Sequence, residues 1–342
     1  MAELILGLAV VVLAAIVQGC FMVPMSYVKG WKWENSWAVF SILAMVVFNW
    51  TLGFSTIPQL TNIYAQATAM DFIIPAFFGL CWGIGAIGFG LGIAAVGLAL
   101  GYAIIMALVL SLGAFIPMLI LHPADIFTPK GIIIIIGVVV MVAGIALFGK
   151  AGIRKEKEQG QKTGRITELS KASMKLGIVI CIIGGVFSCF PNVGFALSDS
   201  LIKLAKEFNT DPKWTANSVW TIMFTSGAIA NLAYCGYLFK KNNSFKDYKN
   251  PSFLKNLFLM AITSLLWIVS FVLYGVGASI MGSWGSVIGW SVFIAMSIAV
   301  AGTWGIIQGE WKNTSAVTRK WMFAGLGTLV IAIMLFAYSA SK

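Results

Sequence analysis

Charged side chains are scarce in this sequence of 342 residues, where Asp, Glu, Lys and Arg together make up only 10%. Soluble globular proteins carry about 25% charged residues, so this composition excludes an ordinary soluble enzyme. Histidine is almost absent as well, since His122 is the only one. No nucleophile, base and orienting group occur within reach of one another. We therefore expect no enzymatic activity and no cofactor.

Cysteine offers little chemistry in this chain. None of the five has metal-ligand spacing with a histidine, which argues against a disulfide framework and against a metal site. All five lie in apolar runs, where small residues pack between helices. They are Cys20, Cys81, Cys181, Cys189 and Cys235.

Long apolar runs are abundant, with 59% hydrophobic residues, and they exclude a disordered chain. Ten runs are long enough to cross about 30 Å of hydrocarbon as a helix. They cover residues 4–25, 37–57, 72–94, 98–121 and 131–149, then 176–198, 214–239, 254–275, 281–306 and 321–339. The sequence therefore predicts an all-α integral membrane protein with ten transmembrane helices.

The basic residues are distributed unevenly between the loops. The segment 150–175 and the loops after spans 1, 7 and 9 hold 18 of the 23 Lys and Arg residues. An excess of basic residues marks cytoplasmic loops, so both termini are predicted to be periplasmic or extracellular. The net charge of +11 is then a topology signal, and we expect no nucleic-acid partner.

The basic segment divides the chain into two equal sets of spans. Residues 1–149 form the first five-helix half, 150–175 a cytoplasmic linker and 176–342 the second five-helix half. An odd number of helices per half gives the two halves opposite orientations, which is an inverted-topology repeat. Such repeats hold a substrate near the midplane and work by alternating access. No pore signature or Walker A sequence points to a channel or a pump, so secondary transport is favoured.

Glycines in span 3 spell a nominal dinucleotide motif, Gly83, Gly85 and Gly88. That motif needs a preceding strand, whereas here it lies inside an apolar span. Close packing of helices, as in the pair Gly79 and Gly83, is the better interpretation.

Ionisable residues are almost absent from the spans, which favours a neutral polar ligand over a charged one. Aromatic rings, amides and hydroxyls suit a sugar, although tryptophans also populate interfacial belts and buried amides also join helices. The predicted substrate-binding residues are Gln18, Trp82, Asn192, Trp267, Ser270, Tyr274 and Trp290. Pro191 predicts a broken helix beside Asn192, and Pro24 and Pro117 predict further breaks in spans 1 and 4.

A proton-coupled carrier needs a titratable group. The two leading candidates are Glu34, predicted in the first cytoplasmic loop, and Asp199, at the outer end of span 6. A solvated carboxylate at the membrane interface is the alternative for both.

Residues 20–37, CFMVPMSYVKGWKWENSW, resemble the opening of the L-rhamnose–proton symporters of the drug/metabolite transporter superfamily. Trp82-Gly83-Ile84-Gly85 is similar to the third-helix motif of that family, and the resemblance covers nearly the whole chain. Further matching positions are Trp267, Phe271, Tyr274 and Gly277 in span 8, and Glu310-Trp311-Lys312-Asn313 after span 9.

The resemblance implies import of L-rhamnose, a neutral 6-deoxy sugar, with protons across a bacterial inner membrane. It also favours Glu34, inside the shared motif, as the coupling residue. We expect a monomer whose partners are the sugar, protons and the lipid bilayer. Ala86 and Ser270 stand where the family has amides. Another carrier of the superfamily, exporting or exchanging a different metabolite or coupled to sodium, therefore stays open, as does a non-transporting membrane sensor.

Overall fold

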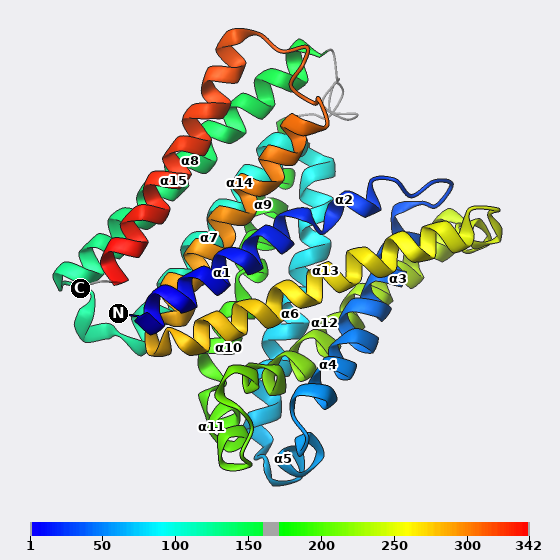
Figure 1. Ribbon diagram of the computed structural model, residues 1–342. Coiled ribbons are helices and arrows are strands. Elements are labelled where there is room, and N and C mark those ends of the chain that lie inside the picture. Colours follow the sequence, from blue (N-terminus) through cyan, green and yellow to red (C-terminus); the bar gives the residue numbers. More distant parts are fainter. Residues whose placement is uncertain (1, 160–170, 341–342) are drawn as a thin grey trace.

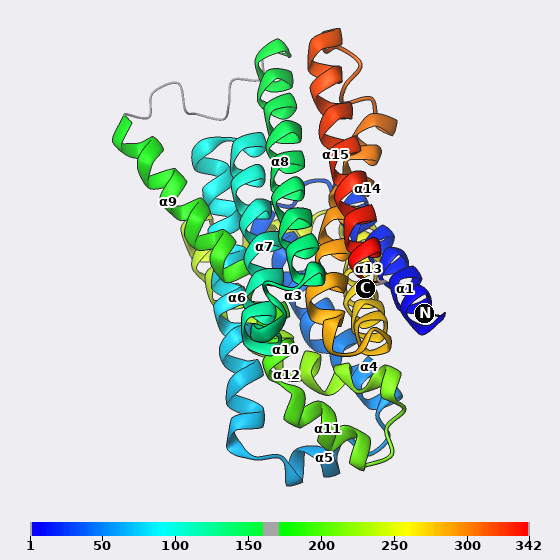
Figure 2. The ribbon, with the colours of Figure 1, turned by 90° about the vertical axis from the view of Figure 1, so that its left-hand side faces the viewer.

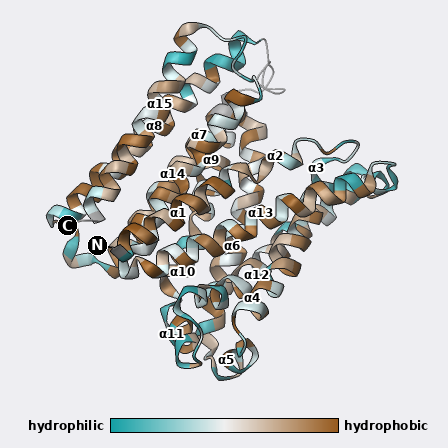
Figure 3. Ribbon diagram, in the orientation of Figure 1, coloured by the Kyte–Doolittle hydropathy of each residue, from teal (hydrophilic) through white to brown (hydrophobic). Residues whose placement is uncertain are grey.

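The computed structural model describes residues 2–159 and 171–340, and within these ranges the chain is helical with no strand. Ten segments are long and apolar enough to cross a membrane, which confirms the predicted number. The protein is therefore a multi-pass membrane protein. Apolar residues extend along the helices, and hydrophilic residues gather at turns and helix ends (Figure 3).

The first half holds five spans, two of them interrupted. Span 1 consists of α1 (Ala2–Cys20) and α2 (Met22–Met25), and span 2 of α3 (Trp33–Ile42), the π-helical η1 (Leu43–Phe48) and α4 (Asn49–Thr56). Spans 3 to 5 are α6 (Ala69–Val96), α7 (Leu98–Leu121) and α8 (Pro129–Glu158). The short α5 (Leu60–Gln66) and η2 (Pro123–Asp125) lie in connections. Gly97, with φ +93°, separates α6 from α7, at the boundary that the sequence predicted.

The second half also holds five spans. Span 6 consists of α9 (Lys171–Ser188) and α10 (Phe190–Leu197), and spans 7 and 8 are α12 (Ala216–Asn242) and α13 (Phe253–Ile280). Span 9 joins the π-helical η7 (Gly285–Gly289) to α14 (Trp290–Ile307), and span 10 is α15 (Ala316–Ala340). The connections contain α11 (Asp199–Glu207), η4 (Pro212–Trp214), η5 (Phe245–Lys249) and η6 (Gly282–Trp284).

Prolines lie beside two of the interruptions. The helix breaks at Phe21, before Pro24, and at Cys189, before Pro191, because a proline cannot donate to the carbonyl four residues earlier. The predicted breaks in spans 1 and 6 are confirmed. The predicted break at Pro117 is wrong, since α7 runs through it without interruption. The carbonyl that Pro117 leaves free has another partner, described below.

The segment 150–175 is more helical than a linker. α8 continues to Glu158, where Arg154 and Glu158 pair at 3.8 Å on one helix face, and α9 begins at Lys171. The charged residues at this end of α8 are good helix formers, and pairs four residues apart support a helix. The rest of the predicted linker, 160–170, lies outside the described residues.

The helices pack mostly across the two halves. α1 packs against α13 and α14, α6 against α9 and α12, and α7 against α9. α8 and α15 lie side by side at one edge of the molecule (Figures 1 and 2). Glycines permit the close approach of α6 and α12, because a Cβ on Gly79 would overlap the carbonyl of Met223. A Cβ on Gly83 would likewise lie 2.5 Å from the carbonyl of Gly227, which confirms helix packing as the role of the pair Gly79 and Gly83.

Two ends of the molecule matter for the site. The basic end is formed by residues 26–32, 242–252 and 308–315, and the opposite end by 57–68, 122–128 and 208–215. The two termini lie near each other, away from the basic end (Figures 1 and 2).

Candidate substrate site

Aromatic side chains from five spans meet in the middle of the bundle. Trp82, near the midpoint of α6, stacks on Trp267, near the midpoint of α13, with ring centroids 5.6 Å apart and an angle of 16°. Phe224 of α12 meets Trp267 edge-on at 4.7 Å. We call this group the central aromatic cluster. Its members are Phe40, Trp82, Trp220, Phe224, Trp267, Phe271, Tyr274, Trp290 and Phe293.

Helical spacing on α13 explains why the cluster forms. Trp267, Ser270, Phe271 and Tyr274 are three or four residues apart and so share one helix face, and all are buried. Gly227 of α12 leaves room for the ring of Trp82, which lies opposite this face. A Cβ on Gly227 would lie only 2.8 Å from Cε3 of Trp82. A larger residue at that position would push Trp82 off its partner.

Gln18 and Ser270 join α1 to α13 beside the cluster. The Ser270 hydroxyl lies 2.5 Å from Oε1 of Gln18 and 2.6 Å from the carbonyl of Trp267. A hydroxyl has one proton, so it donates to one of these oxygens at a time. Among the described residues, none accepts a hydrogen bond from Nε2 of Gln18. The half-buried amide of Gln18 thus keeps donor capacity next to the aromatic rings.

Asn192 is fully buried and joins four elements. Its Nδ2 donates to the carbonyls of Gly113 and Ser286, each at 2.6 Å, and its Oδ1 accepts from the hydroxyl of Tyr274. Gly113 lies four residues before Pro117, so its carbonyl has no helical N–H partner. Asn192 therefore supplies the hydrogen bond that Pro117 removes, which explains how α7 passes through that proline unbroken.

Trp290 contacts α7 one turn from this junction. Its Nε1 donates to the carbonyl of Val109 at 3.1 Å, and its ring lies against Gly113, where a Cβ would overlap the indole nitrogen. Its ring also meets Tyr274 edge-on, with centroids 5.6 Å apart. Trp290 and Asn192 together hold α7 against the second half of the chain.

Three buried polar groups near the cluster have no hydrogen-bond partner in the described part of the chain. They are Nε1 of Trp220, Oγ1 of Thr263 and Oγ of Ser264, on side chains that are at most 1% exposed. Stranding a buried polar group costs about 1–3 kcal/mol, so these groups are candidates for hydrogen bonds to a ligand. Sequence reasoning missed all three. The signal for Thr263 was its position on the same face of α13 as Trp267, Ser270 and Tyr274.

The two carboxylates predicted to couple protons lie in very different surroundings. Glu34 is 3% exposed and accepts hydrogen bonds from Nδ2 of Asn242 at 2.9 Å and Oγ of Ser244 at 2.5 Å. It belongs to the first turn of α3, so the prediction that it lies in a loop is wrong. The helix starts before it, where Oδ1 of Asn35 accepts a hydrogen bond from the backbone N–H of Lys32 at 3.2 Å. Asp199 is 60% exposed and pairs with Lys203 at 2.6 Å on α11.

The structure therefore brings seven of the nine predicted site residues together and leaves two outside. Gln18, Trp82, Trp267 and Ser270 meet at mid-depth, while Asn192, Tyr274 and Trp290 lie nearer the opposite end. Glu34 lies at the basic end. Phe40 of the same helix links it to the cluster, with its ring 5.4 Å from that of Trp267.

Hydrogen bonds close both ends of the bundle around the cluster. At the basic end, Asn256 holds the backbone of Lys29 through two hydrogen bonds, and the hydroxyl of Tyr248 donates to the carbonyl of Asn35 at 2.9 Å. Burial raises the pKa of Tyr248 to about 12, so this donor stays protonated. At the opposite end, Tyr64 donates toward the carbonyl of Ser218 and the hydroxyl of Thr221, both at 2.7 Å.

Comparison with known proteins gives one family. The family model "L-rhamnose-proton symport protein (RhaT)" matches residues 1–339. An L-rhamnose-proton symporter of Salmonella paratyphi A is 27% identical over 322 residues, which cover 92% of this chain and 91% of that protein. Those of Salmonella paratyphi B and Salmonella newport have the same identity and coverage. This chain belongs to the RhaT family of L-rhamnose-proton symport proteins, and it is a carrier by family rather than an enzyme.

Proposed function

We propose that this protein imports a neutral sugar, with L-rhamnose as the first candidate, together with protons. The observation that carries the proposal is the stacked pair Trp82 and Trp267. Among the residues that the structure describes, this pair lies beside buried polar groups without partners and away from buried charges. Membership of the RhaT family supports the same substrate class.

Sugar recognition follows from the chemistry of this cluster. Ring faces of Trp82 and Trp267 suit the C–H surface and the methyl group of a 6-deoxy sugar, and hydroxyl groups need donors and acceptors nearby. Gln18, Ser270 and Tyr274 supply these, as do the free groups of Trp220, Thr263 and Ser264. Asn192 and Trp290 border the proposed site on the side that faces away from the basic end.

We further propose an inverted repeat with alternating access. A twofold axis that exchanges spans 1 to 5 with spans 6 to 10 relates the contacts of α1 with α13 and α14 to those of α9 with α6 and α7. It also pairs the interrupted spans 1 and 6, and leaves α8 and α15 as partners of each other. Interrupted helices at corresponding positions are typical of the substrate site in such repeats.

The basic end is proposed to face the cytoplasm of a bacterium, with the protein in the inner membrane and both termini outside. The positive-inside rule supports this orientation. Glu34 is proposed as the proton-binding residue, because a buried carboxylate held only by neutral donors gains and loses a proton without breaking an ion pair. Neither Lys nor Arg lies within 4.0 Å of its carboxylate among the described residues.

Uptake of labelled L-rhamnose into proteoliposomes tests the proposal. We expect accumulation that requires an inward proton gradient at matched membrane potential. An uncoupler should abolish it. Uptake that does not depend on the proton gradient but requires a sodium gradient would identify sodium, and not the proton, as the coupling ion. Absence of rhamnose uptake by folded protein would refute the substrate.

A second candidate is a carrier of a different small metabolite. Ser270 stands on α13 where the family has an amide, and its hydroxyl is paired with Gln18, which favours a different set of contacts with the substrate. A competition panel of sugars and amino acids against labelled rhamnose separates the two. Competition by deoxy sugars alone supports the first candidate, whereas stronger competition by another metabolite supports the second.

A further inference from the structure

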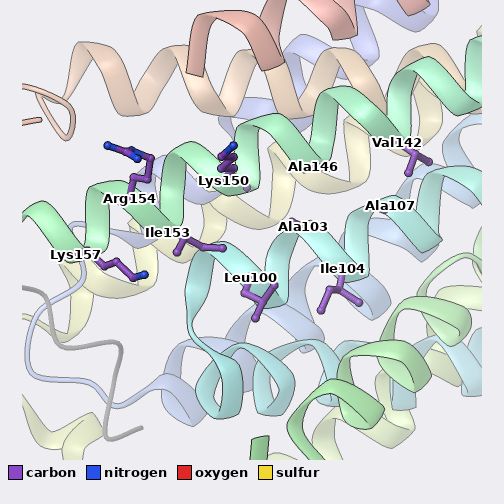
Figure 4. A pocket seen from close by; sticks show the side chains of 11 residues that line it. Leu100, Ala103, Ile104, Ala107, Val142, Ala146, Lys150, Ile153, Arg154 and Lys157 are labelled. Atoms are coloured by element: carbon purple, nitrogen blue, oxygen red, sulfur yellow. The ribbon is translucent and has the colours of Figure 1, made fainter. Parts of the chain in front are cut away.

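A groove of about 520 Å³ lies between α7 and α8, outside the central aromatic cluster. α7 contributes Leu100, Ala103, Ile104 and Ala107, and α8 contributes residues from Val142 to Lys157 (Figure 4). Its volume is in the range of small-molecule sites, about 300–1,000 Å³. Neither the proposed sugar site nor the hydrogen bonds that close the two ends of the bundle use these residues.

The lining of the groove changes from apolar to basic along α8. Val142, Ala146 and Gly149 line its deeper part, and Lys150, Arg154 and Lys157 line the part nearest the basic end. At 1.5 Å per residue, the stretch from Val142 to Ile153 is about 16 Å long. That length matches half of the roughly 30 Å hydrocarbon core, which is the depth reached by the acyl chains of one leaflet.

In the described part of the chain, two of the three cations have no carboxylate partner. Arg154 pairs with Glu158 at 3.8 Å and also contacts Thr318. Lys150 lies over the ring of Trp321, 3.6 Å from its centroid, and neither it nor Lys157 forms an ion pair within residues 2–159 and 171–340. The neighbouring segment 160–170 carries two basic residues and one acidic residue, so its net charge does not neutralise them.

We propose that this groove binds an anionic phospholipid, with the acyl chains along α7 and α8 and the phosphate at Lys150, Arg154 and Lys157. Charge complementarity selects an anionic headgroup, and the apolar stretch selects a lipid over a soluble anion. The side chain of Lys157 extends from α8 on the side of α7 (Figure 4). The side chains of Lys150 and Arg154 lie on the side of α8 that faces α15, where they contact Trp321 and Thr318. Basic pockets between transmembrane helices recognise lipid headgroups in this way.

The test measures lipid retained by the purified protein. Native mass spectrometry counts bound phosphatidylglycerol and phosphatidylcholine with identical acyl chains, for the wild type and for the variant Lys150→Gln/Lys157→Gln. Each basic residue near an anionic lipid contributes about 1 kcal/mol, so we expect the variant to bind phosphatidylglycerol about thirtyfold more weakly. The matched control Lys240→Gln/Lys246→Gln removes two exposed charges at the same end and is expected to bind like the wild type.

A second variant separates the groove from diffuse surface charge. Ala103→Phe fills the α7 side of the groove without changing any charge, and it is expected to reduce lipid retention while elution and thermal unfolding stay unchanged. Equal retention of phosphatidylcholine, equal weakening in both charge variants, or full retention by Ala103→Phe would overturn the proposal. Displacement of phosphatidylglycerol by an equal concentration of soluble glycerol phosphate would also overturn it, since it would identify a site for free anions.

Discussion

Replacing Asn192 by alanine is the substitution whose consequence follows most directly from the structure. Asn192 donates to the carbonyls of Gly113 and Ser286 and accepts from Tyr274. Alanine removes all three hydrogen bonds at once. The carbonyl of Gly113 then loses the donor that replaces the missing N–H of Pro117, four residues later. The expected result is a protein of lower stability in which α7 is less firmly held.

The size of the effect follows from the number of bonds lost. Hydrogen bonds between helices in a membrane contribute about 0.6 kcal/mol on average and up to about 1.7 kcal/mol. Three of them give about 2–5 kcal/mol. Tyr274→Phe removes only one of the three and is expected to cost about 0.6–1.7 kcal/mol, so the two variants should rank in that order.

Thermal unfolding in one detergent, followed by tryptophan fluorescence, measures this loss. Ser297→Ala is the matched control, because Ser297 is also buried but its hydroxyl bonds only to the carbonyl of Phe293 in its own helix, at 2.5 Å. We expect the control to unfold close to the wild type and Asn192→Ala to unfold several degrees lower.

Two results would refute this reasoning. An unfolding midpoint for Asn192→Ala equal to that of Ser297→Ala would mean that the three bonds do not hold the bundle. An unchanged midpoint together with a large rise in the KM for sugar would mean that Asn192 serves the ligand alone, as the sequence by itself suggested.

Three further predictions concern the aromatic pair, the coupling residue and the helix contacts. Trp267→Leu should raise the KM for sugar about fivefold, since an aromatic contact is worth about 1 kcal/mol, whereas Trp50→Leu, outside the central aromatic cluster, should leave it unchanged; equal KM values would contradict the site. Glu34→Gln should abolish accumulation driven by a proton gradient while sugar exchange persists, and Asp199→Asn, on an exposed side chain, should change neither; the reverse result in proteoliposomes would move coupling to Asp199. Gly79→Ala should destabilise the protein by about 1–3 kcal/mol, because its Cβ meets the backbone of Met223. Gly90→Ala places a Cβ where no atom lies within 4 Å, and should stabilise the protein by about 0.5–1 kcal/mol. Equal thermal unfolding midpoints for the two variants would contradict the tight packing of α6 and α12.

The ten spans were predictable because hydrocarbon admits only apolar helices with their backbone hydrogen bonds satisfied internally. The length of the apolar run 72–121 located the boundary at Gly97, and the missing N–H of proline located the breaks beside Pro24 and Pro191. It failed at Pro117, because whether a proline breaks a helix depends on what satisfies the freed carbonyl. That partner, Asn192, lies 79 residues from Gly113 in the sequence and becomes visible only in the folded structure.

The site was predictable in its residue types and less so in its geometry. Aromatic and amide residues deep in the spans were expected to converge, and Trp82 and Trp267 do so. Thr263 and Ser264 were missed because hydroxyls in a span usually bond to their own helix, and only the structure reveals that these two do not. Glu34 was assigned to a loop because charge alone marked the membrane boundary, whereas Asn242 at the end of α12 and Ser244 just after it hydrogen-bond to its carboxylate in a buried position.

The contacts between helices also bear on the alternating access proposed above. α6 and α7 pack with α9, and α13 and α14 pack with α1, so the molecule contains two bundles that each combine helices from both halves of the sequence. Trp82 belongs to the first bundle and Trp267 to the second. A motion that separates these bundles would part the two stacked rings. The ring faces that now contact each other would then be free to contact a sugar. The bonds of Asn192 to Tyr274 and Ser286 join the same two bundles, so under the proposed alternating access they would have to break each time the opposite end opens.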